Sequence, residues 1–438
     1  MCEERALRGT PESMKRCLVL VMRKGLRIRA DHIQTMLDLA TEIHLVTQEP
    51  EVVVGDPRFA SCLRLPRNIS HNEIVKATVQ VAQAHGASAV ITFNETDITI
   101  AGEANERIGV KWARAEADRI SRDKFRQRSF LREYGIPSVW YYPVVDSTAA
   151  LDVAKAHGFP LIVKPTRAAS SVNVELVSDL DRLGNALEAI RELVGSGRGN
   201  YYDGIPENWA ILEEYLPGQE VTLDAIVLNG QFILGGVHNK LTSSGPFFEE
   251  DLYTLPFTMP EREKELTQMA RSITRHLEVD TTLFNAELRA DANGNFRVVE
   301  FSTRISGGHV YRNIRDVYAI DLVRMFVRAA CGESVESILA QENRRCPARM
   351  ATCAKVIYTN GRVIRNSVGN AIYSPYFRAY YPLAEPGMSV ACAPRGFDIT
   401  GLLSVWMPWH SDQSPSVVHS VAYDLANKLD LEVEEVAD

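Results

Sequence analysis

Two glutamates, Glu287 and Glu300, lie on neighbouring apolar stretches that have the pattern of β-strands. The stretches, 284–289 and 296–301, are joined by Asp-Ala-Asn-Gly-Asn, which is typical of a tight turn, so we predict a β-hairpin. Because side chains alternate across a strand, the two carboxylates can face the same side at matching height. Like charges in that position repel unless a cation lies between them, and a hard divalent cation with oxygen ligands meets this need.

Exposure to solvent is the ordinary alternative for such a pair, because charged side chains mostly face water. Here Glu287 is set among apolar residues and Glu300 ends an apolar run, which predicts partial burial. A buried carboxylate needs a partner. Arg304 follows four residues after Glu300, at the start of the glycine-containing loop 305–308. Its guanidinium would add a fixed cation beside the metal ions, and the loop would leave backbone N–H groups for a ligand oxygen.

Lys164 ends an apolar run and is followed directly by Pro165. A lysine at the end of a buried strand needs an anionic partner. The small residues of 166–173, which include Ser170 and Ser171, come next. Their backbone N–H and hydroxyl groups could wrap phosphates, although a plain hairpin loop fits the same pattern.

A second group of polar residues surrounds a predicted hinge. Residues 209–220 have the pattern of a strand that ends in paired glutamates, an aromatic residue and Pro-Gly. Exposed backbone groups in such a hinge can imitate base pairing to adenine, and a carboxylate such as Glu220 can hold ribose hydroxyls. A predicted hairpin with an Asn-Gly turn then delivers His238 and Lys240 at its end.

The overall composition is that of an ordinary globular protein. The chain has 438 residues, of which 45% are hydrophobic and 24% charged, and its formal charge is −8. This charge argues against nucleic acid or an anionic membrane as a partner. The seven cysteines are scattered without a C-x-x-C motif, which predicts neither disulfides nor zinc and fits a reducing cytoplasm. The apolar run 17–22 is too short for a secretory signal or a membrane span, and the polar residues 1–13 are expected to fray.

The elements that must position these residues can be outlined from the apolar pattern. Strands and helices alternate over 17–120, which predicts a small parallel open sheet. Glu95 follows its third predicted strand, where such sheets place ligands, although a solvated loop fits as well. Ser121 is predicted to cap the helix that follows. From about 347 onward, strands and turns closed by a helix over 414–429 predict a separate α+β subdomain.

Four signals in fixed order resemble those of the ATP-grasp superfamily of carboxylate-amine ligases, over about 111–331. They are Lys124, Lys164 in FPLIVKP, the hinge EEYLPGQE, and Glu287 with Glu300-x-x-x-Arg304. With the glycine loop and the terminal subdomain, the chain looks most like the L-amino-acid ligases, which join two amino acids into a dipeptide. The resemblance implies a mixed α/β and α+β fold of three parts: an N-terminal parallel α/β domain (1–120), an ATP-grasp region (121–345) with a mobile lid at about 146–215, and a C-terminal α+β subdomain (346–438).

The resemblance also implies roles for individual residues. ATP phosphates would be held by Lys124, Lys164, Ser170 and Ser171, adenine by Glu214 and the backbone of Tyr215 and Leu216, and ribose by Glu220. Two Mg²⁺ or Mn²⁺ ions would be bound by Glu287 and Glu300. Arg304 would steady the acyl phosphate and the tetrahedral oxyanion, and either His238 or Lys240 would lie near the γ-phosphate.

This sequence departs from the pattern at two positions. Ser302 stands where the superfamily commonly has an Asn metal ligand, and Asn173 replaces a glycine of the phosphate loop. The implied activity is ATP-dependent coupling of one amino acid to the amine of another through an acyl phosphate, with release of ADP and phosphate. The alternatives are another ATP-grasp ligase or carboxylase, and a non-catalytic nucleotide-binding module. No A-M-K-M segment for biotin attachment is present, which disfavours a self-contained carboxylase. A homodimer is the default assembly.

Overall fold

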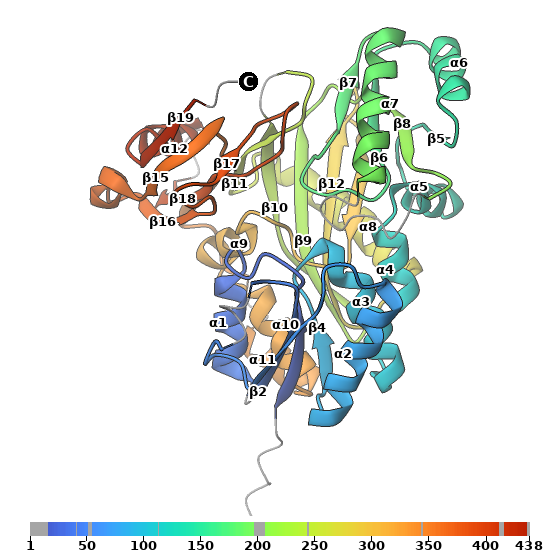
Figure 1. Cartoon of the computed structure of the whole chain (residues 1–438). Coiled ribbons are helices and arrows are strands. Elements are labelled where there is room, and N and C mark those ends of the chain that lie inside the picture. The colour runs from blue at the N-terminus through green and yellow to red at the C-terminus, as the bar shows by residue number, and fades with distance from the viewer. Residues whose placement is uncertain are drawn as a thin grey trace, which may run out of the picture.

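The computed structural model describes residues 16–40, 42–50, 55–112, 114–196, 206–242, 245–342, 345–410 and 416–435. The polar stretch 1–13, predicted to fray, lies outside these ranges. The described residues form four β-sheets, and Figure 1 shows the N-terminal part below, the predicted lid above and the C-terminal strands to one side. Within the described ranges, no helix has the length and apolar character that crossing a membrane requires.

The N-terminal part contains the predicted parallel sheet, with strand order β3-β2-β1-β4. Its first strand is buried along its whole length, as the continuous apolar run predicts for a parallel strand covered on both faces. One short, partly exposed strand, β3, was not predicted because its apolar pattern is weak. The elements are β1 (Cys17–Val21), α1 (Ala30–Leu39), β2 (Glu42–Thr47), β3 (Ser61–Arg64), α2 (His71–His85), β4 (Ala89–Ile91), η2 (Glu95–Asp97) and α3 (Ile98–Ile108).

Two short helices, α4 (Ala115–Ser121) and α5 (Lys124–Glu133), connect this sheet to the rest of the chain. The predicted cap at Ser121 is wrong, because Ser121 is the last residue of α4. Asp123 caps α5 instead, and its carboxylate accepts the backbone N–H groups of Phe125 and Arg126. Lys124 is therefore the first residue of a helix, in a fixed position.

The strands of the predicted lid (about 146–215) belong to a four-stranded antiparallel sheet of order β5-β8-β6-β7, which two helices cover and whose first strand, β5, precedes the predicted boundary. The apolar residues of this sheet and its helices form a core cluster of their own between 144 and 212. Such a core is what a subdomain needs if it is to move as a unit. The elements are β5 (Tyr141–Val144), α6 (Ser147–His157), β6 (Leu161–Pro165), β7 (Glu175–Val177), α7 (Leu180–Gly195) and β8 (Ala210–Glu214).

The largest sheet has eight strands in the order β13-β12-β9-β10-β11-β14-β18-β16. The predicted hairpins around Asn229-Gly230 and around 291–295 are both confirmed. The strands are β9 (Glu220–Leu228), β10 (Gln231–Thr242), β11 (Glu250–Leu255), β12 (Thr282–Ala290), β13 (Phe296–Ser302), β14 (Met350–Ile357), β16 (Phe377–Pro382) and β18 (Gly401–Pro408).

The C-terminal strands do not form a sheet apart from the ATP-grasp region. β14 pairs with β11 in antiparallel register, so the predicted boundary at 345 divides the sequence but not the large sheet. Only a small three-stranded sheet of order β17-β15-β19 stands beside it. The remaining C-terminal elements are β15 (Gly361–Ser367), η5 (Gly369–Tyr373), β17 (Ser389–Val390), α12 (Ser416–Ala426) and β19 (Asp430–Glu434).

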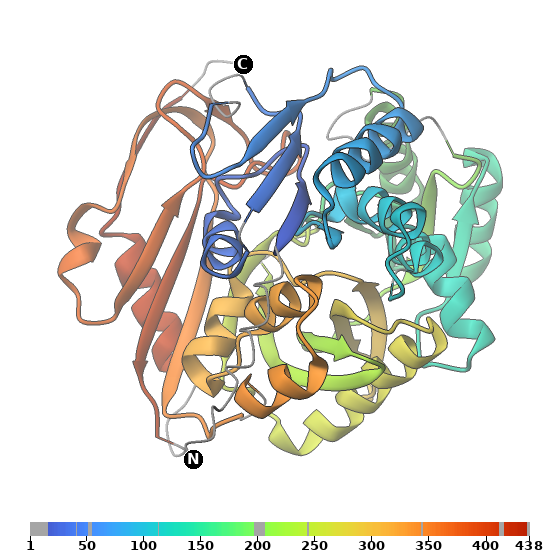
Figure 2. The same cartoon turned by 90° about the horizontal axis from the view of Figure 1, so that it is seen from below.

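A group of helices between 260 and 342 packs against the large sheet. Figure 2 shows the later members of this group, in orange, next to the N-terminal strands in blue and the central strands in green. One core cluster joins β1, α1, β9 and α10, so the N-terminal domain is held against the large sheet by shared apolar burial. The helices are η4 (Pro260–Arg262), α8 (Glu263–His276), α9 (Val310–Tyr318), α10 (Leu322–Ala330) and α11 (Val335–Glu342).

Candidate active site

A cavity of about 400 Å³ lies where the N-terminal domain, the lid, the large sheet and the C-terminal strands meet. Its wall contains every predicted site residue except His238. These residues are Lys124, Lys164, Ser170, Ser171, Glu214, Tyr215, Leu216, Glu220, Lys240, Glu287, Glu300 and Arg304. Residues from four separate parts of the chain therefore converge on one cavity, as a ligand site between domains requires.

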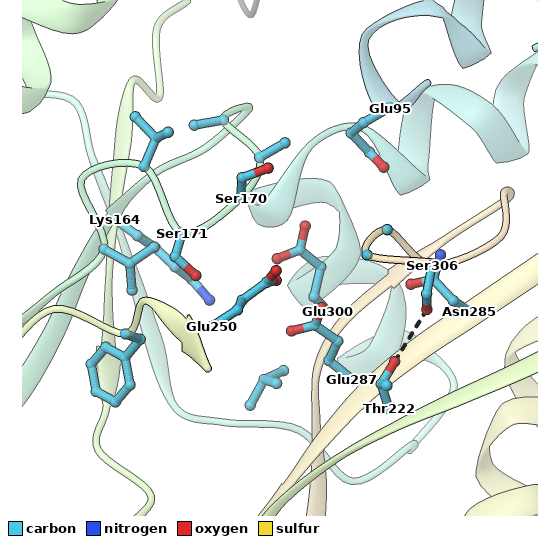
Figure 3. A pocket seen from close by; sticks show the side chains of 18 of the residues that line it. Glu95, Lys164, Ser170, Ser171, Thr222, Glu250, Asn285, Glu287, Glu300 and Ser306 are labelled. Carbon is cyan, nitrogen blue, oxygen red and sulfur yellow. Dashed lines mark hydrogen bonds between the residues drawn. The ribbon is translucent and has the colours of Figure 1, made fainter. Parts of the chain in front are cut away.

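Glu287 and Glu300 are direct register partners on β12 and β13. Asn285 and Ser302 form the next pair on the same face, because side chains two residues apart point to the same side of a strand. Figure 3 shows the carboxylates of Glu287 and Glu300 pointing into the cavity, with Glu250 approaching them from β11 of the same sheet. The hairpin prediction is confirmed in its register as well as in its position.

Each of these carboxylates is paired with a lysine. Lys124 Nζ lies 3.0 Å from Glu300 Oε1, and Lys240 Nζ lies 2.9 Å from Glu287 Oε2. Burial alone would raise the pKa of Glu300, but Lys124 and Lys164 together lower it to about 2. Burial raises the pKa of Glu287 to about 7, only partly offset by Lys240. Glu287 and Glu300, together with the nearby side-chain amide of Asn285, offer oxygen ligands of the kind that Mg²⁺ prefers.

Lys164 is buried in β6 and pairs with a residue that the sequence reasoning missed. Its Nζ lies 2.7 Å from Glu213 Oε2, and the other oxygen of Glu213 lies 2.8 Å from Arg128 Nη2. Burial lowers the pKa of Lys164, and Glu213 opposes this change. Glu213 therefore holds both a lid lysine and the fully buried arginine of α5, which ties the lid to the helix that carries Lys124.

The hinge residues lie against the same cavity. The Glu214 carboxylate accepts the backbone N–H of Trp140 at 2.8 Å, which fixes its orientation at the edge of the lid sheet. Glu220 Oε1 is 2.7 Å from Lys240 Nζ, and Glu220 Oε2 is 2.9 Å from Arg289 Nη1. Burial alone would raise the pKa of Glu220, but Lys240 and Arg289 lower it. Glu220 is therefore a charged acceptor in the cavity wall.

The loop after β6 has an unusual backbone. Ser170, Ser171 and Asn173 all have positive φ, between 53° and 56°. Asn is one of the few residues other than Gly that tolerates this region, which explains how Asn173 can stand where related loops have glycine. Figure 3 shows the hydroxyls of Ser170 and Ser171 on the side of the cavity that also holds Lys164.

His238 is placed differently from the expectation. It lies on β10 opposite Thr222, but it is fully buried, does not line the cavity, and neither ring nitrogen has a hydrogen-bonding partner among the described residues. Burial lowers its pKa to about 3, so the ring is neutral. Lys240, two residues on, reaches the cavity. Of the two alternatives, the geometry therefore favours Lys240 as the residue near the phosphates, and His238 is part of the packed interior.

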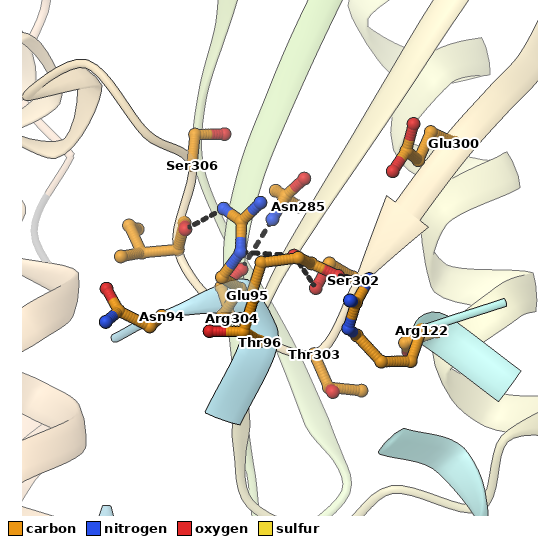
Figure 4. Close-up of polar contacts among 12 residues, drawn as sticks. Asn94, Glu95, Thr96, Arg122, Asn285, Glu300, Ser302, Thr303, Arg304 and Ser306 are labelled. Atoms are coloured by element: carbon orange, nitrogen blue, oxygen red, sulfur yellow. Dashed lines mark hydrogen bonds and ion pairs between the residues drawn. The ribbon is translucent and has the colours of Figure 1, made fainter. Parts of the chain in front are cut away.

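Arg304 is held by an acid from the N-terminal domain. Figure 4 shows its guanidinium against Glu95, with Asn285 and Ser302 beside it. Ser302 Oγ donates to Glu95 Oε2 at 3.0 Å, and Asn285 Nδ2 donates to the Arg304 carbonyl at 2.7 Å. Glu95 is therefore in a buried ion pair and not in a solvated loop. Burial alone would lower the pKa of Arg304, but Glu95 raises it.

The cavity wall also contains polar residues that the sequence did not predict. Glu213, Glu250 and Asn285 line the cavity but were not predicted as site residues. Asn285 lies two residues before Glu287, so strand periodicity could have found it. Glu250 begins β11 and pairs with Thr242 on β10 after a shift in register, and no local pattern indicates it.

With this geometry in hand, the comparisons with known proteins agree on one class. Residues 157–312 match the family model described as "ATP-grasp domain". This part of the chain is an ATP-grasp domain. The fold extends beyond the matched domain, because the crystal structure of the L-amino acid ligase from Bacillus licheniformis superposes with a TM-score of 0.79 at 16% identity, covering 96% of this chain and 99% of that one.

Two relatives show the range of the similarity. Alanine–anticapsin ligase of Bacillus subtilis (strain 168) is 26% identical over 281 residues, covering 60% of this chain and 58% of that protein. Carnosine synthase 1 of Homo sapiens is 24% identical over 317 residues, covering 67% of this chain and 37% of that protein. The matches thus span less than two thirds of the length of these relatives.

Proposed function

We propose that this protein is an ATP-dependent ligase that activates the carboxylate of one amino acid as an acyl phosphate and couples it to the amine of a second, forming a dipeptide or a similar amide. ADP and phosphate would be the other products. The observation that carries the proposal is the convergence of Glu287, Glu300, Lys124, Lys164 and Arg304 on one cavity. The names of the relatives, an alanine–anticapsin ligase and a carnosine synthase, support amino acids as substrates.

The chemistry requires this mixture of charges. A carboxylate does not react with an amine in water until its oxygen becomes a good leaving group, and phosphoryl transfer achieves this. When bound at Glu287 and Glu300, one or two Mg²⁺ or Mn²⁺ ions would supply charge neutralisation for the phosphates. Ser302 faces Glu95, so Asn285 is the better placed third oxygen donor.

The protein's own cations would complete the neutralisation. We assign Lys124, Lys164 and Lys240 to the phosphates, since all three are buried lysines in the cavity wall. We assign Arg304 to the oxygens of the acyl phosphate and of the tetrahedral intermediate, because a guanidinium anchored by Glu95 presents fixed donors. The serines at positive φ in the loop after β6 would cover the terminal phosphate.

The adenine and the ribose of ATP can be assigned to residues of the hinge. We assign the adenine to the backbone of Tyr215 and Leu216 beside Glu214, and the ribose to Glu220, all of which line the cavity at the hinge. A carboxylate can accept hydrogen bonds from both ribose hydroxyls. The lid at about 146–215 would close over the nucleotide and exclude water from the acyl phosphate.

We also propose a cytoplasmic location. Cys62, Cys331, Cys353 and Cys392 are free cysteines in the described parts of the chain, as a reducing compartment favours. A homodimer is proposed as the default assembly, and light scattering on the purified protein tests it.

The products of ATP test the proposed function. We expect ADP, phosphate and amide in equal amounts when pairs of the twenty amino acids are screened, and a hydroxamate when hydroxylamine replaces the amine, since an acyl phosphate reacts with any good nucleophile. The variant Arg304→Lys should lower the hydroxamate yield, because an ammonium cannot make the bidentate contact of a guanidinium. AMP as the stoichiometric nucleotide product would overturn the proposal even if a dipeptide formed.

A further inference from the structure

Arg29 is a buried cation that the assignments above do not use. It immediately precedes α1, is 7% exposed, and lines the cavity from the N-terminal side. Its Nη1 is 3.4 Å from His32 Nε2 and 3.5 Å from the Ser306 carbonyl oxygen, and its Nε has no hydrogen-bonding partner among the described residues. Both contacts are long for hydrogen bonds, whereas a buried guanidinium normally makes short bonds to an anion.

The acids nearest Arg29 already have other partners. Glu95 pairs with Arg304, and Asp224 accepts the backbone N–H of Ser306 through Oδ1 at 2.8 Å. Asp31, two residues along, pairs with Arg312. In the described parts of the chain, no carboxylate forms an ion pair with Arg29. Burial and the nearby Arg304 lower the pKa of Arg29 to about 9, so the guanidinium is still charged at neutral pH.

The position of Arg29 in the cavity indicates that the anion it binds is separate from the phosphates of the nucleotide. The lysines assigned to phosphate lie on α5, β6 and β10, whereas Arg29 faces the cavity beside Ser306, Gly307 and Gly308. Arg304 is near enough to Arg29 to lower its pKa. A second anion can therefore bind on the Arg29 side of the reacting centre without displacing the nucleotide.

A substrate carboxylate that keeps its charge fits this place. In amide formation, the activated carboxylate is converted into an acyl phosphate, whereas the carboxylate of the amine-donating amino acid stays ionised throughout. A guanidinium can hold such a group through two parallel hydrogen bonds. We propose that Arg29 binds the free carboxylate of the amino acid that supplies the amine. This inference rests on the proposed function and assigns the acceptor subsite to the N-terminal domain.

A comparison of acceptors tests the inference on the unmodified protein. Each L-amino acid that gives product as the acceptor is compared with its primary carboxamide, which has the same side chain and amine but no negative charge. We expect the amino acid to be favoured in kcat/KM by roughly 10- to 150-fold, the range expected for losing hydrogen bonds to a buried charge. Equal use of the acid and its carboxamide would overturn the inference.

The variant Arg29→Gln tests the same contact by changing the protein instead of the substrate. We expect it to raise KM for the acceptor amino acid by a similar factor and to lose the preference for the acid over the carboxamide. Arg29→Lys should restore part of that preference. The matched control is Arg27→Gln, which removes an arginine two residues away that is 59% exposed and pairs with Glu385 outside the cavity. It should leave both constants unchanged.

A hydroxamate assay distinguishes a failure of this inference from a failure of the proposed function. Hydroxylamine carries no carboxylate, so Arg29→Gln should form hydroxamate from the first amino acid at the wild-type rate and with an unchanged KM for ATP. Loss of hydroxamate in the variant would mean that Arg29 serves the activated substrate, and would overturn the inference. Absence of hydroxamate from the wild type would count against the proposed function instead. Thermal melting of each variant establishes that it is folded.

Discussion

At the scale of single residues, the site is built from charges that neutralise one another before any substrate binds. Lys124 pairs with Glu300, Lys240 with Glu287 and Glu220, and Lys164 with Glu213. The lysine of each pair is buried, whereas Glu287 and Glu300 are each 28% exposed, so removal of a carboxylate leaves a buried lysine without its counter-charge. Binding of a magnesium nucleotide would exchange these partners: the carboxylates would turn to the metal and the lysines to the phosphates.

Glu300→Gln tests the metal assignment. The amide keeps the shape of the side chain but removes the charge that would hold Mg²⁺, so ADP release should fall by orders of magnitude. The variant should still fold, with a lower melting temperature because the buried Lys124 loses its charged partner. Rates are measured across a titration of Mg²⁺. Glu265→Gln, which removes a carboxylate that is 40% exposed on α8, should behave like the wild type. Near-normal turnover of Glu300→Gln at low Mg²⁺ would show that the metal assignment is wrong.

Lys164→Ala tests the phosphate assignment in the lid. ATP binding measured by calorimetry should weaken by roughly 1.5–3 kcal/mol, the cost of losing a charge-assisted contact. The fold should survive, because Arg128 still pairs with Glu213 in the variant. Lys155→Ala on α6 removes an exposed lysine from the same subdomain and should bind ATP normally. An unchanged affinity in Lys164→Ala would instead assign this lysine a structural role through Glu213.

At the scale of elements, β9 and β12 present the site and the segment after β13 completes it. Asp224 on β9 is fully buried and accepts the N–H of Ser306, which fixes the start of the glycine loop. Gly218 shows how close these elements lie, because a Cβ there would meet the Ala290 carbonyl oxygen at 2.6 Å. The hinge after the lid therefore requires glycine for a close backbone approach, and not only for turn geometry.

Asp224 also predicts a pH dependence of stability. Burial raises its pKa to about 6, above the value near 4 of an unfolded chain. Between those values the unfolded chain releases the proton and the folded chain keeps it, so stability should fall as pH rises from about 4 to 6, by at most roughly 1.4 kcal/mol per pH unit. Asp224→Asn cannot titrate but still accepts the Ser306 N–H, so its melting temperature should fall less over this range.

Melting temperatures of the two proteins between pH 4 and pH 7 measure this difference. Asp424→Asn is the control, because Asp424 is 61% exposed and its loss should leave the pH profile as in the wild type. Parallel profiles for the wild type and Asp224→Asn would show that Asp224 ionises normally in the folded protein.

At the scale of the whole molecule, the cavity is shared by parts with separate cores. The lid has its own apolar cluster, and the N-terminal domain shares one with the helices beneath the large sheet. The lid supplies Lys164 and the serine loop, whereas the large sheet supplies Glu287 and Glu300. A bound nucleotide would therefore bridge two bodies, and closure of the lid is the movement that such an arrangement favours.

Hydrogen exchange tests this movement. Addition of Mg²⁺ with a non-hydrolysable ATP analogue should slow amide exchange in the lid strands β6 and β8 and in the loop 166–173, because closure lowers the population of open forms. Helix α12, which packs on the far C-terminal strands, should exchange as before and is the internal reference. Lys164→Ala should reduce the protection of the lid. Protection confined to the hinge at 214–216 would show that the nucleotide binds without closure.

Several features were determined by the sequence alone. The hairpin of Glu287 and Glu300 follows from strand periodicity and a turn of Asp, Asn and Gly, and its register is as predicted. The parallel N-terminal sheet follows from apolar patterns of local range, whereas the lid at about 146–215 was implied by the resemblance to the superfamily. The order of Lys124, Lys164, the hinge and the acidic hairpin was sufficient to predict the ATP-grasp fold. All these signals act over a few residues, where backbone geometry and side-chain alternation decide the structure.

Other features were decided only by the tertiary structure. Glu95 meets Arg304 across more than two hundred residues, and Glu213 lies between Lys164 and Arg128 because three elements pack there. His238 and Lys240 lie two residues apart on the same strand, and both are buried, yet of the two Lys240 alone lines the cavity. The C-terminal strands join the large sheet because β11 has a free edge for β14. Burial and charge pairing depend on which distant segments meet, and no local pattern of residues encodes that choice.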